Sequence, residues 1–519
     1  MSPFTRPLCT AAMIAVAPCL ATGCGSDGTS QGPVARVVFD APAADGVVDT
    51  YSFTIAFSFE GTTIDPDSVQ LRVNGFPVVV SGGPTRFNAF IDAGPPLRDD
   101  NLAEAQAQAN DGRLVDGSLA FRYLPPKARA RRITDDSDLI LGPLAHSRLG
   151  DYLLENSRAR FVIQDVAQRD FYGVGTFGGN LIDAELIERP GMDNFFELQP
   201  SLNIETVINA QAVEIVNDGQ NGTPAIVRTC GPDDVLDFIN PSAIIDGAGL
   251  SYPASADDID YDIEGCTDYV LEAEKPFLQL TTTVLNNEDD DLGLYVGDYI
   301  NGSGELEQLT TLGAGVGEVQ ANRLGVLSYF GYGEAEGVDY GFITFPEQGA
   351  QRSSFFTQSG VSFVMHAHSV INVLAVGAGP TFLVPAGGSR SFTRFFSVGD
   401  GSAGNAIDVE NEVKGVATGR LHGCVTAGTQ PATGARVSIG RGAATSISSV
   451  SSHFVAGADG CYSGTLPVGN YAAAASLAGH PYEGSEASPP IHPVAIVAGG
   501  DVRLDFTLPA AGRLRGTVA

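Results

Sequence analysis

The chain has 519 residues, a length that predicts about three or four domains. Apolar residues make up 43% and charged residues 17%, which excludes a broadly disordered chain. The formal net charge of -32 argues against nucleic acid as a partner, because phosphate binding needs clustered cations. A P-loop ends in Gly-Lys followed by Ser or Thr, and no lysine of this chain stands in such a sequence, so a P-loop is excluded as well. Frequent Gly (63) and Pro (30) favour many short strands joined by turns.

Residues 1–24 are expected to form an export signal. An apolar run follows Arg6 over residues 8–20, and it is too short for a bilayer, which needs about 20 apolar residues. The run ends in Leu-Ala-Thr-Gly before Cys24, a pattern that resembles the lipobox of bacterial lipoproteins. The resemblance implies that Cys24 is lipidated and becomes the new N-terminus. The alternative is an ordinary cleaved signal peptide in which this cysteine is incidental.

Residues 25–33 are polar and rich in small side chains, which suits a flexible tether behind a lipid anchor. The residue after Cys24 is Gly25 and not Asp. By resemblance to Gram-negative lipoproteins, this implies an exported protein anchored to the outer membrane, facing either the periplasm or the cell surface.

Residues 34–124 are expected to form a β-sandwich. Apolar residues alternate over 51–59 and again over 69–73, where they lead into the turn sequence Asn74-Gly75. The stretch 99–116 is polar and rich in Ala and Gln, which predicts a loop or a short helix. The whole segment resembles the immunoglobulin-like modules of surface proteins.

Residues 125–134 are basic within an acidic chain and are interpreted as a solvated linker. Residues 135–410 contain many strand-like runs separated by turn residues, which predicts a large antiparallel β-sandwich. The sequences GDYLLEN at 150–156, RFVIQ at 160–164 and GGNLID at 178–183 resemble large exported metallohydrolase-like proteins of the carbaryl-hydrolase-like, PHP-type group. That resemblance implies a galactose-mutarotase-like supersandwich that precedes a catalytic domain, the catalytic domain being absent from this sequence.

Residues 416–509 resemble a carboxypeptidase-regulatory-like domain. The resemblance rests on GRLHGCVT at 419–426, GARV at 434–437, DGCY at 459–462 and LPVGNY at 466–471. It implies a transthyretin-like sandwich with a structural or adhesive role and no catalytic residues. The Asp-Gly pair predicts a hairpin turn, and Pro-x-Gly-x-Tyr predicts a strand junction with a buried aromatic ring.

The last residues of the sequence repeat the opening strand of that domain. Residues 512–519 match 419–426 at several positions, so 510–519 are expected to be the first strand of a second, truncated module. A lone opening strand cannot bury its apolar face, and the chain is therefore expected to be part of a longer protein. A chance match of a Gly-rich tail is the alternative.

The cysteines divide between the leader and the expected domains. Four remain after Cys24: Cys230, Cys266, Cys424 and Cys461. Of the three possible pairings, only 230–266 with 424–461 keeps each disulfide within one domain, as expected in an oxidising compartment. A zinc site is the rival, but it needs Cys-x-x-Cys or nearby His spacing, and neither occurs.

The sequence His366-Ala367-His368 is the strongest candidate for a metal site. On a strand, residues i and i+2 share one face, so both imidazoles could bind one ion. His-x-His-Ser also resembles the opening motif of PHP metallohydrolases, whose further His and acidic ligands do not follow here. We therefore interpret His366 and His368 as two histidines on one face of a sandwich strand, and we predict no metal and no cofactor.

Other motifs fit a known sequence pattern but lack the structural context that the pattern requires. The Gly-rich sequence at 173–178 fits the dinucleotide fingerprint but lacks a surrounding βαβ unit, and the Gly-x-Ser-x-Gly match at 28–32 lies in the tether. Acidic runs at 233–234, 257–258 and 288–291 could bind calcium but lack the ligand spacing of an EF-hand loop. They are interpreted as solvated loops.

Taken together, these features predict an all-β, lipid-anchored cell-envelope protein that is the non-catalytic scaffold or recognition region of a larger exported protein. Its expected partner is the membrane, through the lipid on Cys24. One alternative is a sugar-acting or metal-dependent hydrolase that uses His366 and His368. Another is a carbohydrate-binding surface protein, although the chain lacks Trp, the usual platform for sugar stacking.

Overall fold

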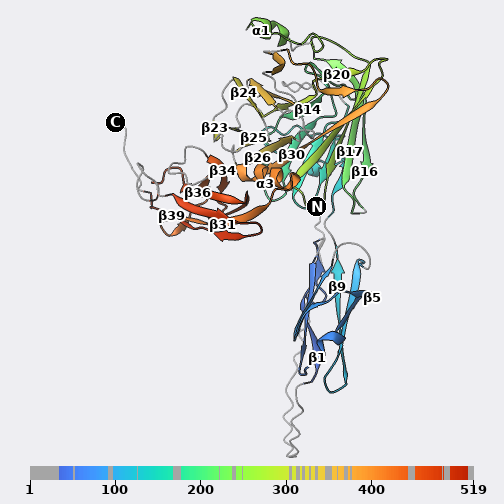
Figure 1. The fold of residues 1–519 in the computed structure, drawn as a ribbon, viewed down its shortest axis with the longest axis vertical. Helices are drawn as coiled ribbons and strands as arrows, with labels where there is room; N and C mark the ends of the chain where they lie inside the picture. The colour runs from blue at the N-terminus through green and yellow to red at the C-terminus, as the bar shows by residue number, and fades with distance from the viewer. Residues whose placement is uncertain are drawn as a thin grey trace, which may run out of the picture. The chain divides into compact units, whose positions relative to one another are not determined.

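The computed structural model divides the chain into two compact units, 1–125 and 126–519, which are described separately below. Strands dominate both units (Figure 1), and the predicted all-β, multi-sandwich class is confirmed. The structure describes these residues: 34–50, 53–91, 97–124, 127–166, 177–220, 222–236, 241–247, 249–302, 307–310, 316–317, 322–326, 329–333, 337–344, 354–358, 361–366, 372–374, 377–441, 450–481, 483 and 491–511.

The first unit is a sandwich of two sheets that enclose one apolar core. One sheet has the order β1 (Arg36–Ala41), β3 (Phe53–Glu60), β7 (Arg86–Ile91) and β6 (Ser81–Gly82). The other has the order β2 (Val47–Val48), β9 (Leu114–Tyr123), β8 (Asp100–Gln108), β4 (Gln70–Val73) and β5 (Phe76–Val78), with the 3-10 helix η1 (Pro66–Ser68) before β4.

Local sequence signals in this unit predict the structure well. On β3, Ile55 and Phe57 are fully buried, as the alternation of apolar residues predicts. Asn74 and Gly75 have φ angles of 51° and 85° and form the turn that joins β4 to β5. Both residues occupy the left-handed region that a two-residue hairpin turn requires.

The prediction of a loop or short helix over 99–116 is wrong, because these residues form β8 and the start of β9. The small apolar residues Ala103, Ala105 and Ala107 alternate toward the core, while charged and amide side chains alternate outward. Ala, Glu and Gln favour helices by intrinsic propensity, but burial of every second residue decides in favour of a strand here.

The second unit contains a large sandwich made of two antiparallel sheets. The first large sheet has the order β10 (Arg129–Arg132), β11 (Tyr152–Glu155), β12 (Ala159–Ile163), β13 (Leu181–Leu186), β14 (Glu197–Ser201), β21 (Gly297–Asn301), β28 (Val361–Met365), β27 (Ser354–Gln358) and β24 (Asn322–Val326). The second has the order β16 (Ala212–Asn217), β17 (Ala225–Val235), β18 (Ile263–Leu271), β19 (Phe277–Asn286), β30 (Ser389–Gly399), β26 (Asp339–Thr344), β25 (Tyr329–Gly333), β22 (Glu307–Thr310) and β23 (Val316–Gly317).

The two large sheets face each other across one apolar core. β15 (Thr206–Ile208) pairs with both β14 and β17 and thereby joins the sheets. Phe161 of the first sheet contacts Phe396 of the second, with ring centroids 6.5 Å apart. Short elements lie outside this framework: η2 (Asp136–Asp138), α1 (Pro241–Gly247), β20 (Leu292–Leu294) and β29 (Phe382–Val384).

The expected linker over 125–134 is wrong for residues 129–132, which form β10 at the edge of the first large sheet. Ala128 and Ala130 are buried in the sandwich core, whereas Arg129 and Arg131 alternate with them and point to the opposite face. Arg132 lies opposite Tyr152 and its guanidinium sits over that ring. The basic residues therefore belong to a strand and not to a solvated linker.

The C-terminal part of this unit is a smaller sandwich with a core of its own. In one sheet, β31 (Thr418–Ala427) pairs with β32 (Gln430–Pro431), β35 (Cys461–Pro467), β38 (Asp501–Arg503) and β39 (Phe506–Leu508). The other has the order β34 (Val450–Val455), β33 (Arg436–Arg441), β36 (Gly469–Ser476) and β37 (His492–Ile496). Gly469 opens β36 and Tyr471 is buried, as predicted, but Asp459-Gly460 joins strands of different sheets and is not a hairpin turn.

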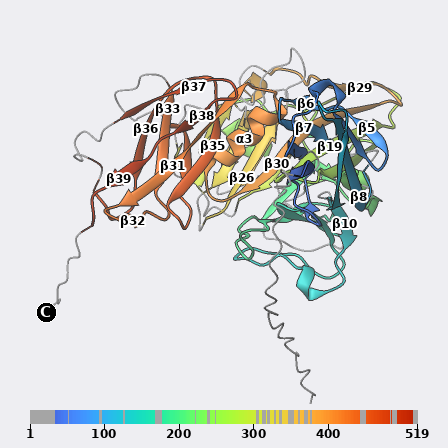
Figure 2. The same ribbon diagram turned by 90° about the horizontal axis from the view of Figure 1, so that it is seen from below.

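Helix α3 (Ala403–Val413) connects the large and small sandwiches, and Figure 2 shows it beside β26 and β30. Ala406 and Ile407 are buried against Ile343 of β26. On the other side, Asp408 accepts a hydrogen bond from the Thr465 backbone N–H (3.0 Å) on β35. The expected parts 135–410 and 416–509 thus keep separate cores but share this helix. The truncated strand expected over 510–519 lies almost entirely outside the described residues.

Candidate functional site

The structure contains two disulfides, Cys230–Cys266 and Cys424–Cys461, in the pairing expected from the sequence. Each joins two residues that lie directly opposite each other on neighbouring antiparallel strands, β17 with β18 and β31 with β35. The four cysteine sulfur atoms considered for a zinc site are therefore bonded to each other in two disulfides.

Several predicted features lie outside the described residues. These are Cys24 with the leader and tether, His368, and residues 173–176 of the Gly-rich stretch. Of the two candidate metal-binding histidines, only His366 is described.

His366 follows β28 and is buried in the large sandwich, where its Nε2 atom lies 2.6 Å from Oδ2 of Asp298. Its ring packs between those of Phe342 and Phe392, at centroid distances of 6.0 and 5.2 Å. One of the two ring nitrogens that could bind a metal is therefore already engaged with a carboxylate. Because His366 lies just after β28 and His368 is outside the described residues, the interpretation of the two as histidines on one face of a strand stays a prediction.

Asp298 is in turn the partner of Arg394, whose side chain is also fully buried. Arg394 Nε donates to both carboxylate oxygens, at 3.1 and 3.0 Å, and Nη2 donates to Oδ1 at 2.6 Å. Its Nη1 donates to Thr282 Oγ1 at 2.6 Å. Because Asp298 belongs to the first large sheet and Arg394 to the second, the ion pair links the two layers through their interior.

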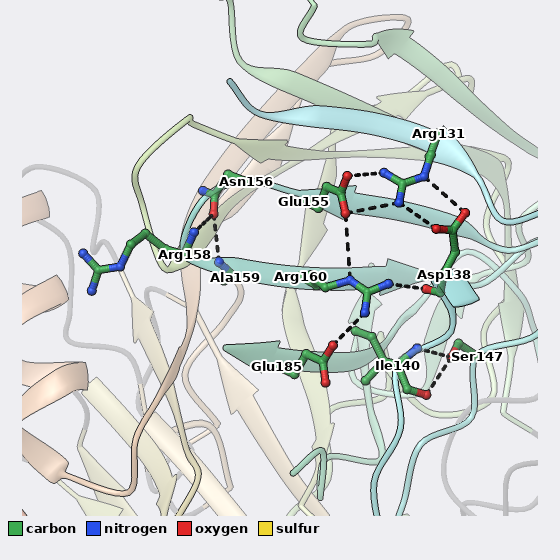
Figure 3. Close-up of polar contacts among 10 residues, drawn as sticks. All are labelled: Arg131, Asp138, Ile140, Ser147, Glu155, Asn156, Arg158, Ala159, Arg160 and Glu185. Carbon is green, nitrogen blue, oxygen red and sulfur yellow. Dashed lines mark hydrogen bonds and ion pairs between the residues drawn. The ribbon is translucent and has the colours of Figure 1, made fainter. Parts of the chain in front are cut away.

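A second polar network crosses the outer face of the first large sheet (Figure 3). Arg131 on β10, Glu155 on β11, Arg160 on β12 and Glu185 on β13 alternate in charge across four adjacent strands. Arg160 Nη1 donates to Glu185 at 2.8 Å, and Arg131 Nη2 donates to Asp138 at 2.8 Å. We call Arg131, Glu155, Arg160 and Glu185 the charge ladder. Each of its side chains forms an ion pair with a neighbour on the adjacent strand, which indicates a structural role.

Two buried carboxylates lie near the charge ladder. Asp183 on β13 accepts hydrogen bonds from the backbone N–H groups of His146 and Ser147, both at 2.7 Å. Burial raises the pKa of Asp183 to about 7. Asp193 accepts from the Tyr340 hydroxyl at 3.1 Å, and burial together with the charge of Asp183 raises its pKa well above the usual range.

The acidic runs noted in the sequence fix loops by accepting backbone hydrogen bonds. Asp233 accepts from the Tyr261 N–H (3.1 Å), and burial raises the pKa of Asp233 to about 7. Glu288 accepts from the Asp262 N–H (3.0 Å). The interpretation of 233–234 as a solvated loop is therefore wrong, because both residues lie on β17 and Asp233 is buried.

Residues Asp257 and Asp258 lie beside a third carboxylate, that of Glu205. Each of the three offers an oxygen atom, and these atoms all lie within 4.8 Å of one another. Glu205 Oε2 accepts from the Asp258 N–H at 3.0 Å. The sequence does not single out Glu205, because it precedes Asp258 by 53 residues and no local spacing connects the two. We call these three residues the carboxylate cluster.

No protein-family model matches the chain, and no curated protein matches it. Among solved structures, CopC from Methylosinus trichosporium OB3b is 20% identical, with a TM-score of 0.15, over 18% of this chain and 95% of CopC. The Slr1438 protein from Synechocystis sp. PCC 6803 is 10% identical, with a TM-score of 0.30, over 49% of this chain and 97% of that protein. An alpha-mannosidase from Enterococcus faecalis V583 is 10% identical, with a TM-score of 0.34, over 73% of this chain and 45% of the mannosidase.

Scores and identities at this level carry no argument about function, so the function has to be argued from the residues of this chain. Within the described residues, no helix has both the length and the apolar character needed to cross a membrane.

Proposed function

We propose that this chain is an exported, lipid-anchored protein of the cell envelope and serves as the scaffold or recognition region of a larger exported protein. The observation that carries the proposal is the pair of disulfides, each of which joins neighbouring strands. Disulfides form and persist in oxidising compartments such as the periplasm and the cell surface. The leader that ends at Cys24 supplies the matching export signal and the site for lipid.

The polar contacts within the large sandwich also support a scaffold role. The most interconnected polar groups, Asp298 with Arg394 and the charge ladder, are engaged with one another between or across strands. Such groups hold strands and sheets together, which is what a scaffold requires. The hydrolase alternative would need His366 to leave Asp298 before it could bind a metal.

The lipid anchor is tested by expressing the chain with its own leader in a Gram-negative host that is fed an alkyne fatty acid. We expect label on the wild-type protein and none on Cys24→Ser, which should move from the outer-membrane fraction to the soluble periplasmic fraction. Cys19→Ser, which changes another cysteine of the leader, is the matched control and should be labelled normally. Absence of label from the wild type, or equal label on Cys24→Ser, would overturn the proposal.

The hydrolase alternative is tested separately on the purified protein. Metal analysis and an assay on sugar substrates are compared between wild type and His366→Ala. Bound metal or activity that is lost in the variant would favour the enzyme over the scaffold.

A further inference from the structure

We propose that the outer face of the small sandwich carries a binding site for a sugar acid, a ligand that combines one carboxylate with several hydroxyl groups. The proposal deepens the recognition role in the proposed function and rests on it. The observation that carries it is a groove of about 450 Å³ whose polar lining residues are Arg420, Arg503, His422, Ser463 and Asp400. This volume falls within the range of small-molecule sites, about 300–1,000 Å³.

Three neighbouring strands gather these side chains on one face of the sheet. Arg420 and His422 are two residues apart on β31 and therefore share its outer face. In the register of the sheet, His422 lies opposite Ser463 of β35 on one side and opposite Arg503 of β38 on the other (Figure 2). The disulfide Cys424–Cys461 also lines the groove and fixes β31 to β35 there. The donors that would meet a ligand are thus held in place before it binds.

Both arginines are oriented through their Nε atoms, which leaves their terminal nitrogens available. Arg420 Nε donates to Ser463 Oγ at 2.9 Å. Arg503 Nε donates to the two carboxylate oxygens of Asp505 at 3.3 and 3.0 Å, and the Cys424 N–H donates to the same carboxylate at 2.9 Å. Within the described part of the chain, the Nη atoms of both arginines make no hydrogen bond, and Arg420 forms no ion pair. Two guanidinium groups can therefore bind a carboxylate of the ligand.

Asp400 adds a hydrogen-bond acceptor to the groove from the segment that precedes α3. Its Oδ1 atom accepts from the Ser402 N–H at 3.2 Å and from Asn405 Nδ2 at 2.7 Å, so its Oδ2 atom can accept from a ligand. A hydroxyl group can donate to this oxygen, whereas a second carboxylate cannot. A ligand that suits both the arginines and Asp400 therefore carries hydroxyl groups as well as a carboxylate, as sugar acids do.

The acidic surroundings limit the charge that the ligand can carry. Beside the groove, Asp501 Oδ1 lies 3.2 Å from His422 Nε2, and Asp505 is the partner of Arg503. These carboxylates and Asp400, in a chain of net charge -32, repel a doubly charged phosphate more strongly than a single carboxylate. The site therefore favours a singly charged sugar acid over a phosphorylated sugar.

The test is calorimetric titration of the purified protein with galacturonate and with galactose, which has a CH₂OH group in place of the carboxylate. We expect galacturonate to bind, with an affinity that falls as salt is added, and galactose to bind at least tenfold more weakly. Arg420→Gln and Arg503→Gln should each weaken galacturonate binding at least tenfold, because each removes charged donors. Both side chains are exposed, so the unfolding midpoint of each variant should equal that of the wild type.

Arg113→Gln is the matched control. Arg113 pairs with an aspartate two residues away, as Arg503 does, and both side chains are 66% exposed, so this variant should bind galacturonate as the wild type does. Tighter binding of phosphate or glutamate than of galacturonate would overturn the ligand class. No binding by the wild type, or full affinity in both Arg420→Gln and Arg503→Gln, would overturn the site. Neither result alters the lipid label expected on Cys24, so failure of this site and failure of the proposed function are distinguishable.

Discussion

Asp298 and Arg394 form an ion pair through the interior of the large sandwich, with neither side chain exposed to solvent. Three hydrogen bonds join them, and His366 and Thr282 occupy further polar atoms of the pair. Arg394 also lies over the ring of Phe392, at 4.8 Å from its centroid. A buried pair of this kind is tolerated only when both partners are present, since either one alone would leave an uncompensated charge in the core.

Asp298→Asn should therefore destabilise the large sandwich by about 3–5 kcal/mol, because Arg394 would keep its charge but lose the carboxylate. The measurement is the denaturant midpoint of the second unit. Arg503→Met removes one partner of an exposed pair with Asp505 and should leave the midpoint unchanged. A wild-type midpoint for Asp298→Asn would show that the core pair is not needed for stability.

The charge ladder should be most sensitive at its least exposed pair. Arg160 is 14% exposed and Glu185 only 2%, whereas Arg131 is 35% exposed. Arg160→Met leaves Glu185 as a buried carboxylate with one remaining donor, the Gly191 N–H, and should cost about 2–4 kcal/mol. Arg131→Met should cost less, about 1 kcal/mol, because solvent screens its partners. Equal losses in denaturant unfolding would contradict the ranking.

Asp183 should make stability depend on pH. Its pKa is about 7 in the folded protein, above the value of about 3.9 expected in the unfolded chain. The folded state therefore binds the proton more tightly, and its contribution to stability is complete below pH 4 and is lost as the pH rises to 7. The slope cannot exceed about 1.4 kcal/mol per pH unit for one group.

Asp183→Asn replaces the carboxyl group that binds this proton with a neutral amide that does not titrate. The stability advantage of the wild type over Asp183→Asn should narrow as the pH rises from about 4 to about 7, as measured by denaturant unfolding. A gap that widens with pH would mean that Asp183 is stabilised as the carboxylate, contrary to the effect of its burial.

Each disulfide should stabilise the sandwich that contains it. The bond Cys424–Cys461 closes a loop with a sequence separation of 37 and joins β31 to β35. Replacing both cysteines with Ser should cost about 2–4 kcal/mol, mostly through the greater freedom of the unfolded chain. The unfolding temperature, measured with and without reductant, checks this. The double variant should be less sensitive to reductant than the wild type, and equal sensitivity would count against the prediction.

The sequence by itself was sufficient for features that depend on neighbours along the chain. Alternation identified β3, the Asn74-Gly75 turn has the φ angles that its residues favour, and the count of cysteines led to the pairing that the structure contains. It failed for β8, whose buried residues are Asn101 and three alanines, and for β10, whose arginines concealed a two-residue alternation. In both strands the core accepts small side chains that carry little apolar signal of their own.

Only the tertiary structure decided which polar groups meet. Asp298 precedes His366 by 68 residues and Arg394 by 96, and Glu205 reaches Asp258 across 53. No local periodicity relates such positions, because the pairing of strands and the facing of sheets bring them together. Composition, alternation and turn residues therefore determined that this protein is built from β-sandwiches. The buried ion pair, the charge ladder and the carboxylate cluster arose only when distant strands and loops were packed against each other, since their partners are set by the register and layering of the sheets.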